Sequence, residues 1–254
     1  MPKTIIAVLN QKGGVGKTTT AINLGAYLAR SGRSVLVCDL DPQGNSTSGL
    51  GINKNDLPAT VYDVLFGRSK AEATTLVINS KLSLLPSNGN LAGAEVELVA
   101  ESGREHKLRT AIDRLDYDYI IIDCPPSLGL LTVNALAAAD SVLIPVQAEY
   151  YALEGLSQLL SVITQVRQAV NPNLDILGVL ITLYDNRNSL SAQVKKELEA
   201  YFDQKMFTTV IPRNVRLAEA PSFGRTIIEH DKWSKGARAY KAFAKELDDR
   251  VANA

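Results

Sequence analysis

The sequence predicts an α/β fold: a doubly wound, mostly parallel sheet flanked by helices. Six short segments read as strands, and several of them are apolar at nearly every position, which is typical of strands buried on both faces of a parallel sheet. Segments with helical periodicity separate them, so that strands and helices alternate. A glycine-rich turn also joins the first strand to the first helix. No repeat or linker interrupts the alternation, and we expect one domain over residues 1–254.

Each expected element rests on one of these two patterns. Apolar runs predict strands at Thr4–Leu9, Ser34–Cys38, Leu82–Leu85, Tyr119–Asp123, Ser141–Val146 and Ile176–Leu183. Helical periodicity predicts helices at Thr18–Arg30, Leu91–Leu115, Leu131–Ala138, Gly155–Val170, Ser189–Phe202 and Ser234–Val251. The polar segment Asn53–Thr60 is expected to be a mobile surface loop. Cys38 and Cys124 end predicted strands, where a thiol acts as a small apolar residue of the core.

Composition limits the class of protein. Apolar residues make up 46% of the chain and charged residues 21%, as in an ordinary globular protein. No apolar run approaches the ~20 residues of a membrane-spanning helix, and the N-terminus lacks a signal-peptide pattern. We therefore expect a cytoplasmic protein.

The turn after the first strand carries the chemistry. It reads Lys12-Gly13-Gly14-Val15-Gly16-Lys17-Thr18 and opens the first helix. Backbone amides of such a turn converge on an anion, the helix N-terminus adds partial positive charge, and a Lys-Thr pair serves a terminal phosphate and a magnesium ion. We predict a phosphate loop over residues 11–19, with nucleotide contacts from Gln11, Lys12, Gly13, Gly14, Val15, Gly16, Lys17, Thr18 and Thr19.

This loop departs from the usual pattern in two places. Gln11 stands where a glycine is expected, and Lys12 adds a second lysine. The loop thus resembles the deviant Walker A family of P-loop ATPases, which includes the partition ATPases ParA and Soj, the division-site ATPase MinD and the nitrogenase iron protein. The resemblance implies ATP sandwiched between two subunits, with Lys12 reaching the partner's phosphates. The alternative is a glycine-rich turn with two solvated lysines.

Aspartates follow two of the predicted strands. Asp39 and Asp41 come after the second strand and Asp123 ends the fourth, so that all should lie at the carboxyl edge of the sheet, where ligands bind. These segments resemble the family's switch I (39–49) and switch II (123–131). The resemblance implies that Asp123 holds Mg²⁺ through a water, beside Thr18, and that Asp41 orients the attacking water. Alternatively, Asp39 and Asp41 cap a turn.

The likeness to ParA and Soj proteins covers essentially the whole chain. It is close at Leu180–Arg187 and Ile211–Ser222, and the region 182–222 is expected to serve the base and DNA. It implies that Pro212 and Asn214 lie near the adenine, although Asn214 could equally be a helix N-cap. It also implies catalysis by Lys12, Lys17 and Asp41.

Charge is unevenly distributed along the chain. The net charge is zero, but the segment from Arg187 to the C-terminus carries thirteen Lys and Arg against nine Asp and Glu. The resemblance implies a slow, partner-stimulated ATPase, an ATP-dependent homodimer, a ParB-like centromere-binding partner and non-specific binding of double-stranded DNA on the nucleoid. The DNA-contact candidates, each of which could instead be merely solvated, are Arg187, Lys195, Lys196, Arg213, Arg216 and Arg238.

Three other functions remain open. The first is a MinD-like membrane ATPase, which the acidic pair Asp248-Asp249 in the C-terminal helix disfavours. The second is a ParA-like ATPase that positions another cargo, such as a plasmid, a chemoreceptor cluster or a metabolic compartment. The third is a kinase or synthetase built on the same phosphate loop.

Overall fold

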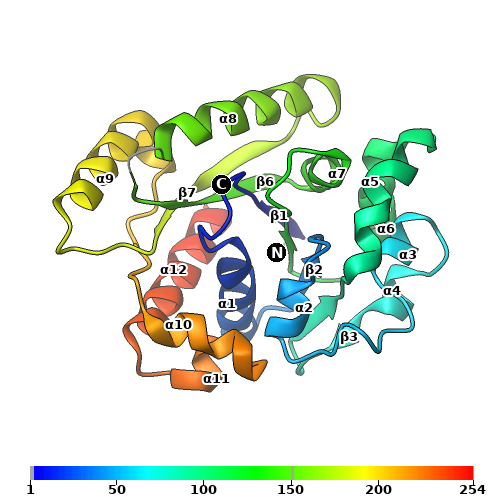
Figure 1. Cartoon of the computed structure of the whole chain (residues 1–254), viewed down its shortest axis with the longest axis horizontal. Helices are drawn as coiled ribbons and strands as arrows, with labels where there is room; N and C mark the ends of the chain where they lie inside the picture. The colour runs from blue at the N-terminus through cyan, green and yellow to red at the C-terminus, as the bar shows by residue number, and fades with distance from the viewer. Residues whose placement is uncertain (1–2, 150–151, 254) are drawn as a thin grey trace.

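A seven-stranded sheet organises the residues that the computed structural model describes, 3–149 and 152–253 (Figure 1). Its order is β3-β4-β2-β5-β1-β6-β7. The strands are β1 (Thr4–Val8), β2 (Val35–Asp39), β3 (Leu76–Val77), β4 (Leu82–Leu85), β5 (Tyr119–Asp123), β6 (Ser141–Gln147) and β7 (Asp175–Thr182). Only the edge pair β3–β4 is antiparallel. The prediction of a doubly wound, mostly parallel sheet is confirmed.

Strand register brings the predicted functional segments to one edge. β1 lies between β5 and β6, and Asp39 of β2 is paired with Asp123 of β5. After β1 the chain crosses to β2 on one side of the sheet, whereas β6 and β7 extend it on the other, so the strand order reverses at β1. Ligands of such sheets bind at this reversal, at the carboxyl ends of the strands.

Helices cover both faces of the sheet (Figure 1). One hydrophobic cluster joins β strands to the helices from α3 to α9, and the other joins them to α1, α11 and α12. The α-helices are α1 (Lys17–Arg30), α2 (Asn45–Gly49), α3 (Val61–Leu65), α4 (Ala71–Thr74), α5 (Ala94–Glu97), α6 (Lys107–Ile112), α7 (Leu130–Ala138), α8 (Ala152–Ala169), α9 (Ser189–Phe202), α10 (Val215–Glu219), α11 (Ile227–Asp231) and α12 (Lys235–Ala252).

The C-terminal helix α12 packs along α1 and is joined to it at both ends. Near the start of α1, the Thr20 hydroxyl and the Tyr240 hydroxyl share a buried hydrogen bond of 3.0 Å. Beyond the end of α1, Asp248 accepts hydrogen bonds from Arg33 and from the hydroxyl of Tyr119. Because contacts early in α1 meet the start of α12 and later contacts meet its end, the two helices run in the same direction.

The predicted helix Leu91–Leu115 is wrong as a single element. The segment contains the short helices α5 and α6 with three 3₁₀ turns, η1 (Gly89–Gly93), η2 (Leu98–Ala100) and η3 (Arg104–His106). The helical backbone stops after Ala100, where Glu101 is extended with a ψ of 137°, and Gly103 then has a left-handed φ of 62° that no continuous helix contains. Two further 3₁₀ turns, η4 (Asp203–Lys205) and η5 (Ala220–Phe223), were also not predicted.

Other expectations concern burial and loops. Cys38 and Cys124 are both fully buried, as predicted for core thiols. Residues 53–60 form no helix or strand, although Lys54 Nζ donates to the Gln43 carbonyl; the expected mobility of this loop stays a prediction. Among the described residues, no helix has the length and apolar character needed to cross a bilayer.

Candidate functional site

The phosphate loop borders a cavity of about 330 Å³ at the carboxyl edge of the sheet. The loop and the start of α1 supply one wall, and the segments after β2 and β5 supply the other. The lining residues are Gly13, Gly14, Gly16, Lys17, Thr18, Thr19, Asp41, Gln43, Asn45 and Pro126. The structure thus brings most of the predicted phosphate loop together with Asp41. Gln11, Lys12 and Val15 do not line the cavity.

Glycine conformation and cross-strand contacts shape the loop. Gly14 and Gly16 have φ values of 76° and 87°, which other residues adopt at a cost in energy. Gly16 is the N-cap of α1 and offers no side chain to its first turn, so free amides there face an anion. The Val15 carbonyl accepts a 2.7 Å hydrogen bond from the Thr182 hydroxyl at the end of β7. The loop is therefore fixed to the sheet beside the cavity.

The two loop lysines lie in different surroundings. Lys17 is 7% exposed, and its Nζ donates to the Lys12 carbonyl at 3.2 Å. Burial lowers the pKa of Lys17, while nearby Asp123 opposes this shift. The Lys12 ammonium instead forms an ion pair with Glu149 just beyond β6, and both side chains are nearly half exposed. Gln147 Nε2 donates to the other oxygen of Glu149.

Three aspartates stand behind the cavity with distinct partners. Asp39 accepts from the Thr47 amide at 2.8 Å and the Thr47 hydroxyl at 2.7 Å, so its carboxylate joins the start of the switch I segment to α2 near its end. Asp41 accepts from the Gln43 amide at 2.9 Å and also lines the cavity. The turn-capping alternative thus describes real hydrogen bonds of both residues. For Asp41, capping and a position in the cavity coexist.

Asp123 is fully buried and only partly paired. One oxygen accepts from the Ser46 hydroxyl at 2.8 Å. The other, Oδ1, has no partner with hydrogen-bond geometry, although the Thr18 hydroxyl lies close enough to stabilise the charged carboxylate. An unpaired buried carboxylate oxygen is costly, and the chemistry of this atom fits a cation or a cation-bound water. No cluster of three or more His, Cys, Asp or Glu side chains suited to a metal occurs in the described ranges.

Burial raises the pKa of both Asp39 and Asp123. The second cause for Asp39 is the charge of Asp123 on the neighbouring strand, and hydrogen bonds from Thr47 oppose the shift. For Asp123, hydrogen bonds from Ser46 and Thr18 oppose the rise in pKa that burial causes. The physical reason is that two carboxylates share a space from which water is excluded. A bound cation would favour the charged forms.

We expect this pair to make the nucleotide-free protein less stable as the pH rises. The folded-state pKa of Asp39 lies above its unfolded value, so the folded chain holds its proton more tightly between about pH 4 and about pH 7. The free energy of unfolding contributed by Asp39 is greatest below this window and falls through it. Asp39→Asn should flatten that fall in urea unfolding measured across the window. Asp113→Asn, which removes an exposed carboxyl, is the matched control; an unchanged slope for Asp39→Asn would contradict the assignment.

The predicted base-binding residues lie beside the end of β7. Pro212 forms an isolated bridge with Tyr184, and Asn214 is the N-cap of α10. The alternative of a helix N-cap at Asn214 is confirmed for its position, but its side chain makes no cap hydrogen bond and its Oδ1 is buried without a partner. Like Asp123 Oδ1, this oxygen is available to a ligand.

The DNA-contact candidates fall into separate groups. Arg187 and Arg213 line one hollow of about 640 Å³. Lys195 and Lys196 lie on α9, and Arg238 lies on α12. Several are already paired: Arg187 with Asp185 at 2.9 Å, Lys195 with Glu199 at 2.7 Å and Arg216 with Glu219 at 2.8 Å. The structure therefore brings together only Arg187 and Arg213 in one hollow.

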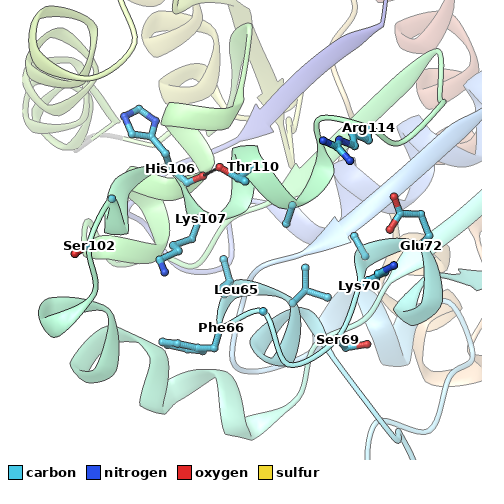
Figure 2. Close-up of a pocket in the computed structure, with 15 residues that line it drawn as sticks. Leu65, Phe66, Ser69, Lys70, Glu72, Ser102, His106, Lys107, Thr110 and Arg114 are labelled. Atoms are coloured by element: carbon cyan, nitrogen blue, oxygen red, sulfur yellow. Dashed lines mark hydrogen bonds between the residues drawn. The ribbon is translucent and has the colours of Figure 1, made fainter.

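Sequence reasoning missed several contributors to the site. Gln43, Asn45 and Pro126 were covered only as members of the switch ranges, and Ser46 and Glu149 were not singled out. A larger hollow, about 940 Å³, lies between the α3–α4 segment and α6 (Figure 2). None of its lining residues belongs to the phosphate loop or to the aspartate cluster, so it is not part of this site.

The doubly wound sheet, the loop and the buried aspartates define a nucleotide-binding protein of the P-loop class. A family model of the AAA domain matches residues 3–176. The chain is 55% identical to the sporulation initiation inhibitor protein Soj of Bacillus subtilis (strain 168), covering 96% of this chain and 97% of the relative. It is 53% identical to the chromosome partitioning protein ParA of Myxococcus xanthus (strain DK1622), covering 97% and 88%. The chain belongs to the Soj/ParA family of chromosome-partitioning ATPases.

A solved structure with the same fold carries a different name. It is cobyrinic acid a,c-diamide synthase from Mycobacterium smegmatis, with a bound ATP analogue and magnesium. The two chains are 41% identical with a TM-score of 0.87, and the match covers 98% of this chain and 96% of the other. This structure shows that a fold so similar holds an ATP analogue and magnesium.

Proposed function

We propose that this chain is an ATP-dependent switch in the segregation of a bacterial chromosome or plasmid. In this proposal an ATP-bound sandwich dimer binds DNA without sequence preference, and hydrolysis releases it. The observation that carries the proposal is the position of the Lys12 side chain. Lys12 is a second loop lysine whose side chain does not line the phosphate cavity of its own chain, as expected of a group that serves another subunit. The partitioning names of relatives at 55% and 53% identity support it further.

The proposal gives a role to residues of the phosphate cavity and to three residues outside its lining, Asp123, Pro212 and Asn214. Lys17 and the loop amides hold the β- and γ-phosphates of ATP, and Pro212 and Asn214 contact the adenine. Thr18 and, through a water, Asp123 would hold Mg²⁺, which would neutralise phosphate charge. Asp41 orients the attacking water from the opposite wall. The unpaired oxygens of Asp123 and Asn214 support the metal and base assignments.

Lys12 and Glu149 connect the site to dimerisation. In the single chain the Lys12 ammonium is paired with Glu149. In the dimer, Lys12 would leave Glu149 and neutralise the partner's phosphates. An exposed ion pair contributes only about 0–1 kcal/mol, so this exchange is energetically easy. Because each cavity would then depend on a second chain, the monomer would turn over ATP slowly. A ParB-like partner that completes the site would stimulate it.

DNA binding is the part of the proposal that a single experiment tests best. We expect wild-type protein to be retained on random duplex DNA with ATP and Mg²⁺, but not with ADP or without nucleotide, while light scattering reports a dimer. Retention should weaken steeply with salt, because it depends on phosphate contacts. In cells the ATP form should then lie on the nucleoid. An ATP-dependent dimer with no affinity for DNA would contradict the proposal.

Two of the alternative functions, the MinD-like membrane ATPase and the kinase or synthetase, are less well supported. A MinD-like anchor needs a C-terminal helix that can insert apolar side chains into a bilayer. Here Phe243 and Leu247 of α12 are fully buried against the rest of the fold. A synthase function rests on the name of one neighbour at 41% identity, whereas the relatives at higher identity are named for partitioning. A ParA-like ATPase that positions another cargo would use the same switch. The experiment with duplex DNA gives the same result for it as for a chromosome or plasmid segregation ATPase.

A further inference from the structure

A groove of about 580 Å³ opens between α1 and α12, away from the phosphate loop. Tyr27 and Arg30 line it from the second half of α1, Trp233 from the turn before α12, and Lys241 and Lys245 from α12 itself. At 1.5 Å per residue, Arg30 lies about 20 Å along α1 from Lys17. This hollow, which we call the Trp233 groove, is therefore separate from the ATP site.

Four cations line the groove, and the carboxylate beside them is paired with a residue outside the lining. Arg30, Lys232, Lys241 and Lys245 all line it, and none of the four forms an ion pair within the described part of the chain. The one carboxylate in the lining, Asp248, is already engaged by Arg33 at 3.0 Å and by the Tyr119 hydroxyl. Four cations around a concave surface create a positive potential that attracts an anion.

An exposed aromatic ring accompanies these cations. The Trp233 side chain is 77% exposed, whereas Tyr27 on the α1 side is 7% exposed. Lys232 Nζ lies 5.2 Å from the centre of the Trp233 ring. A large indole left in water next to unpaired cations provides a stacking surface for another ring beside a site for negative charge.

We propose that the Trp233 groove binds a free nucleotide, with the base stacked on Trp233 and the phosphate among Arg30, Lys241 and Lys245. The volume lies within the roughly 300–1,000 Å³ of small-molecule sites. One exposed ring can stack one base. A duplex keeps its bases inside the helix and cannot offer a ring to Trp233, and an acidic peptide would use the cations without requiring the exposed indole. The groove thus fits a mononucleotide better than either macromolecule.

Trp233 is the single tryptophan of the chain, so intrinsic tryptophan fluorescence reports directly on this groove. One equivalent of ADP with Mg²⁺ would first be added to the full-length protein to fill the phosphate loop without excess nucleotide, and AMP would then be titrated. We expect saturable quenching. Adenosine and inorganic phosphate, which each keep one half of the ligand, should bind about tenfold more weakly.

Variants separate the groove from non-specific charge effects. Lys241→Gln combined with Lys245→Gln should weaken AMP binding about tenfold, and Trp233→Ala should do the same in calorimetry. Lys70→Gln with Arg114→Gln is the matched control, because it removes two exposed cations from the hollow in Figure 2 and should leave AMP affinity unchanged. Absence of saturable quenching by AMP, equal loss in the control, or quenching by duplex DNA alone would overturn the proposal.

Discussion

Replacing Asp41 with alanine should lower ATP turnover by about 100-fold or more while ATP binding is retained. Asp41 is 7% exposed and lines the phosphate cavity opposite Lys17 and Thr18. A carboxylate that positions or deprotonates a reacting water typically contributes about 10²–10⁴ in rate. The variant keeps Lys17, the loop amides and Thr18, so its affinity for ATP should change little. Phosphate release and calorimetric ATP binding measure the two quantities.

The same variant should accumulate as an ATP-bound dimer. Because hydrolysis ends the dimer in the proposed cycle, loss of turnover should keep it on DNA long after the wild type is released. Asp56→Ala is the matched control, since Asp56 contacts only Asn53 in the neighbouring loop among the described residues. Loss of ATP binding with Asp41→Ala would show that this residue holds the nucleotide rather than the water.

Replacing Lys12 with alanine should weaken ATP-dependent dimerisation by about 100-fold and leave ATP binding by the single chain nearly intact. Removing one member of a desolvated interfacial charge pair costs about 2–5 kcal/mol, which corresponds to about 30-fold to a few thousandfold and so includes this factor. Lys17, whose Nζ reaches the loop interior, remains in place. Sedimentation or light scattering at graded protein concentrations gives the dimer affinity.

Glu149→Gln should act in the opposite direction. It removes the in-chain partner of Lys12 and should strengthen dimerisation by up to about fivefold, the worth of an exposed ion pair. Glu97→Gln is a matched control, since Glu97 forms an ion pair of similar exposure with Arg68 far along the sequence from the phosphate loop. A Lys12→Ala chain that dimerises as the wild type does would refute the role of Lys12 across the interface.

The sequence predicted the strands well because burial on both faces leaves a simple pattern. Leu82–Leu85 and Tyr119–Asp123 match the structure residue for residue. The two-residue strand β3 at the sheet edge is too short to leave such a pattern. The predicted long helix at 91–115 was wrong because the prediction joined two apolar segments across Glu101 and Gly103, where the backbone is extended and then left-handed.

For the site, sequence predicted the residues that follow strand ends but not the contacts between distant segments. Asp39 and Asp123 were expected at one edge, and strand pairing places them side by side. Glu149 is 137 residues from Lys12, and no local pattern distinguishes it from other surface carboxylates. Likewise, the free oxygen of Asn214 depends on how the turn before α10 is buried. Such facts arise from tertiary packing alone.

The buried hydrogen bond between Thr20 and Tyr240 links the first turn of α1 directly to the C-terminal helix. Thr20 comes two residues after Thr18 at the cavity wall, and Tyr240 belongs to the helix that carries Arg238 and Lys241. A displacement of the loop when the γ-phosphate arrives or leaves would turn α12 like a lever. In the proposed switch, the presence or loss of the γ-phosphate in the phosphate cavity would thereby change the orientation of the cationic side chains that α12 carries.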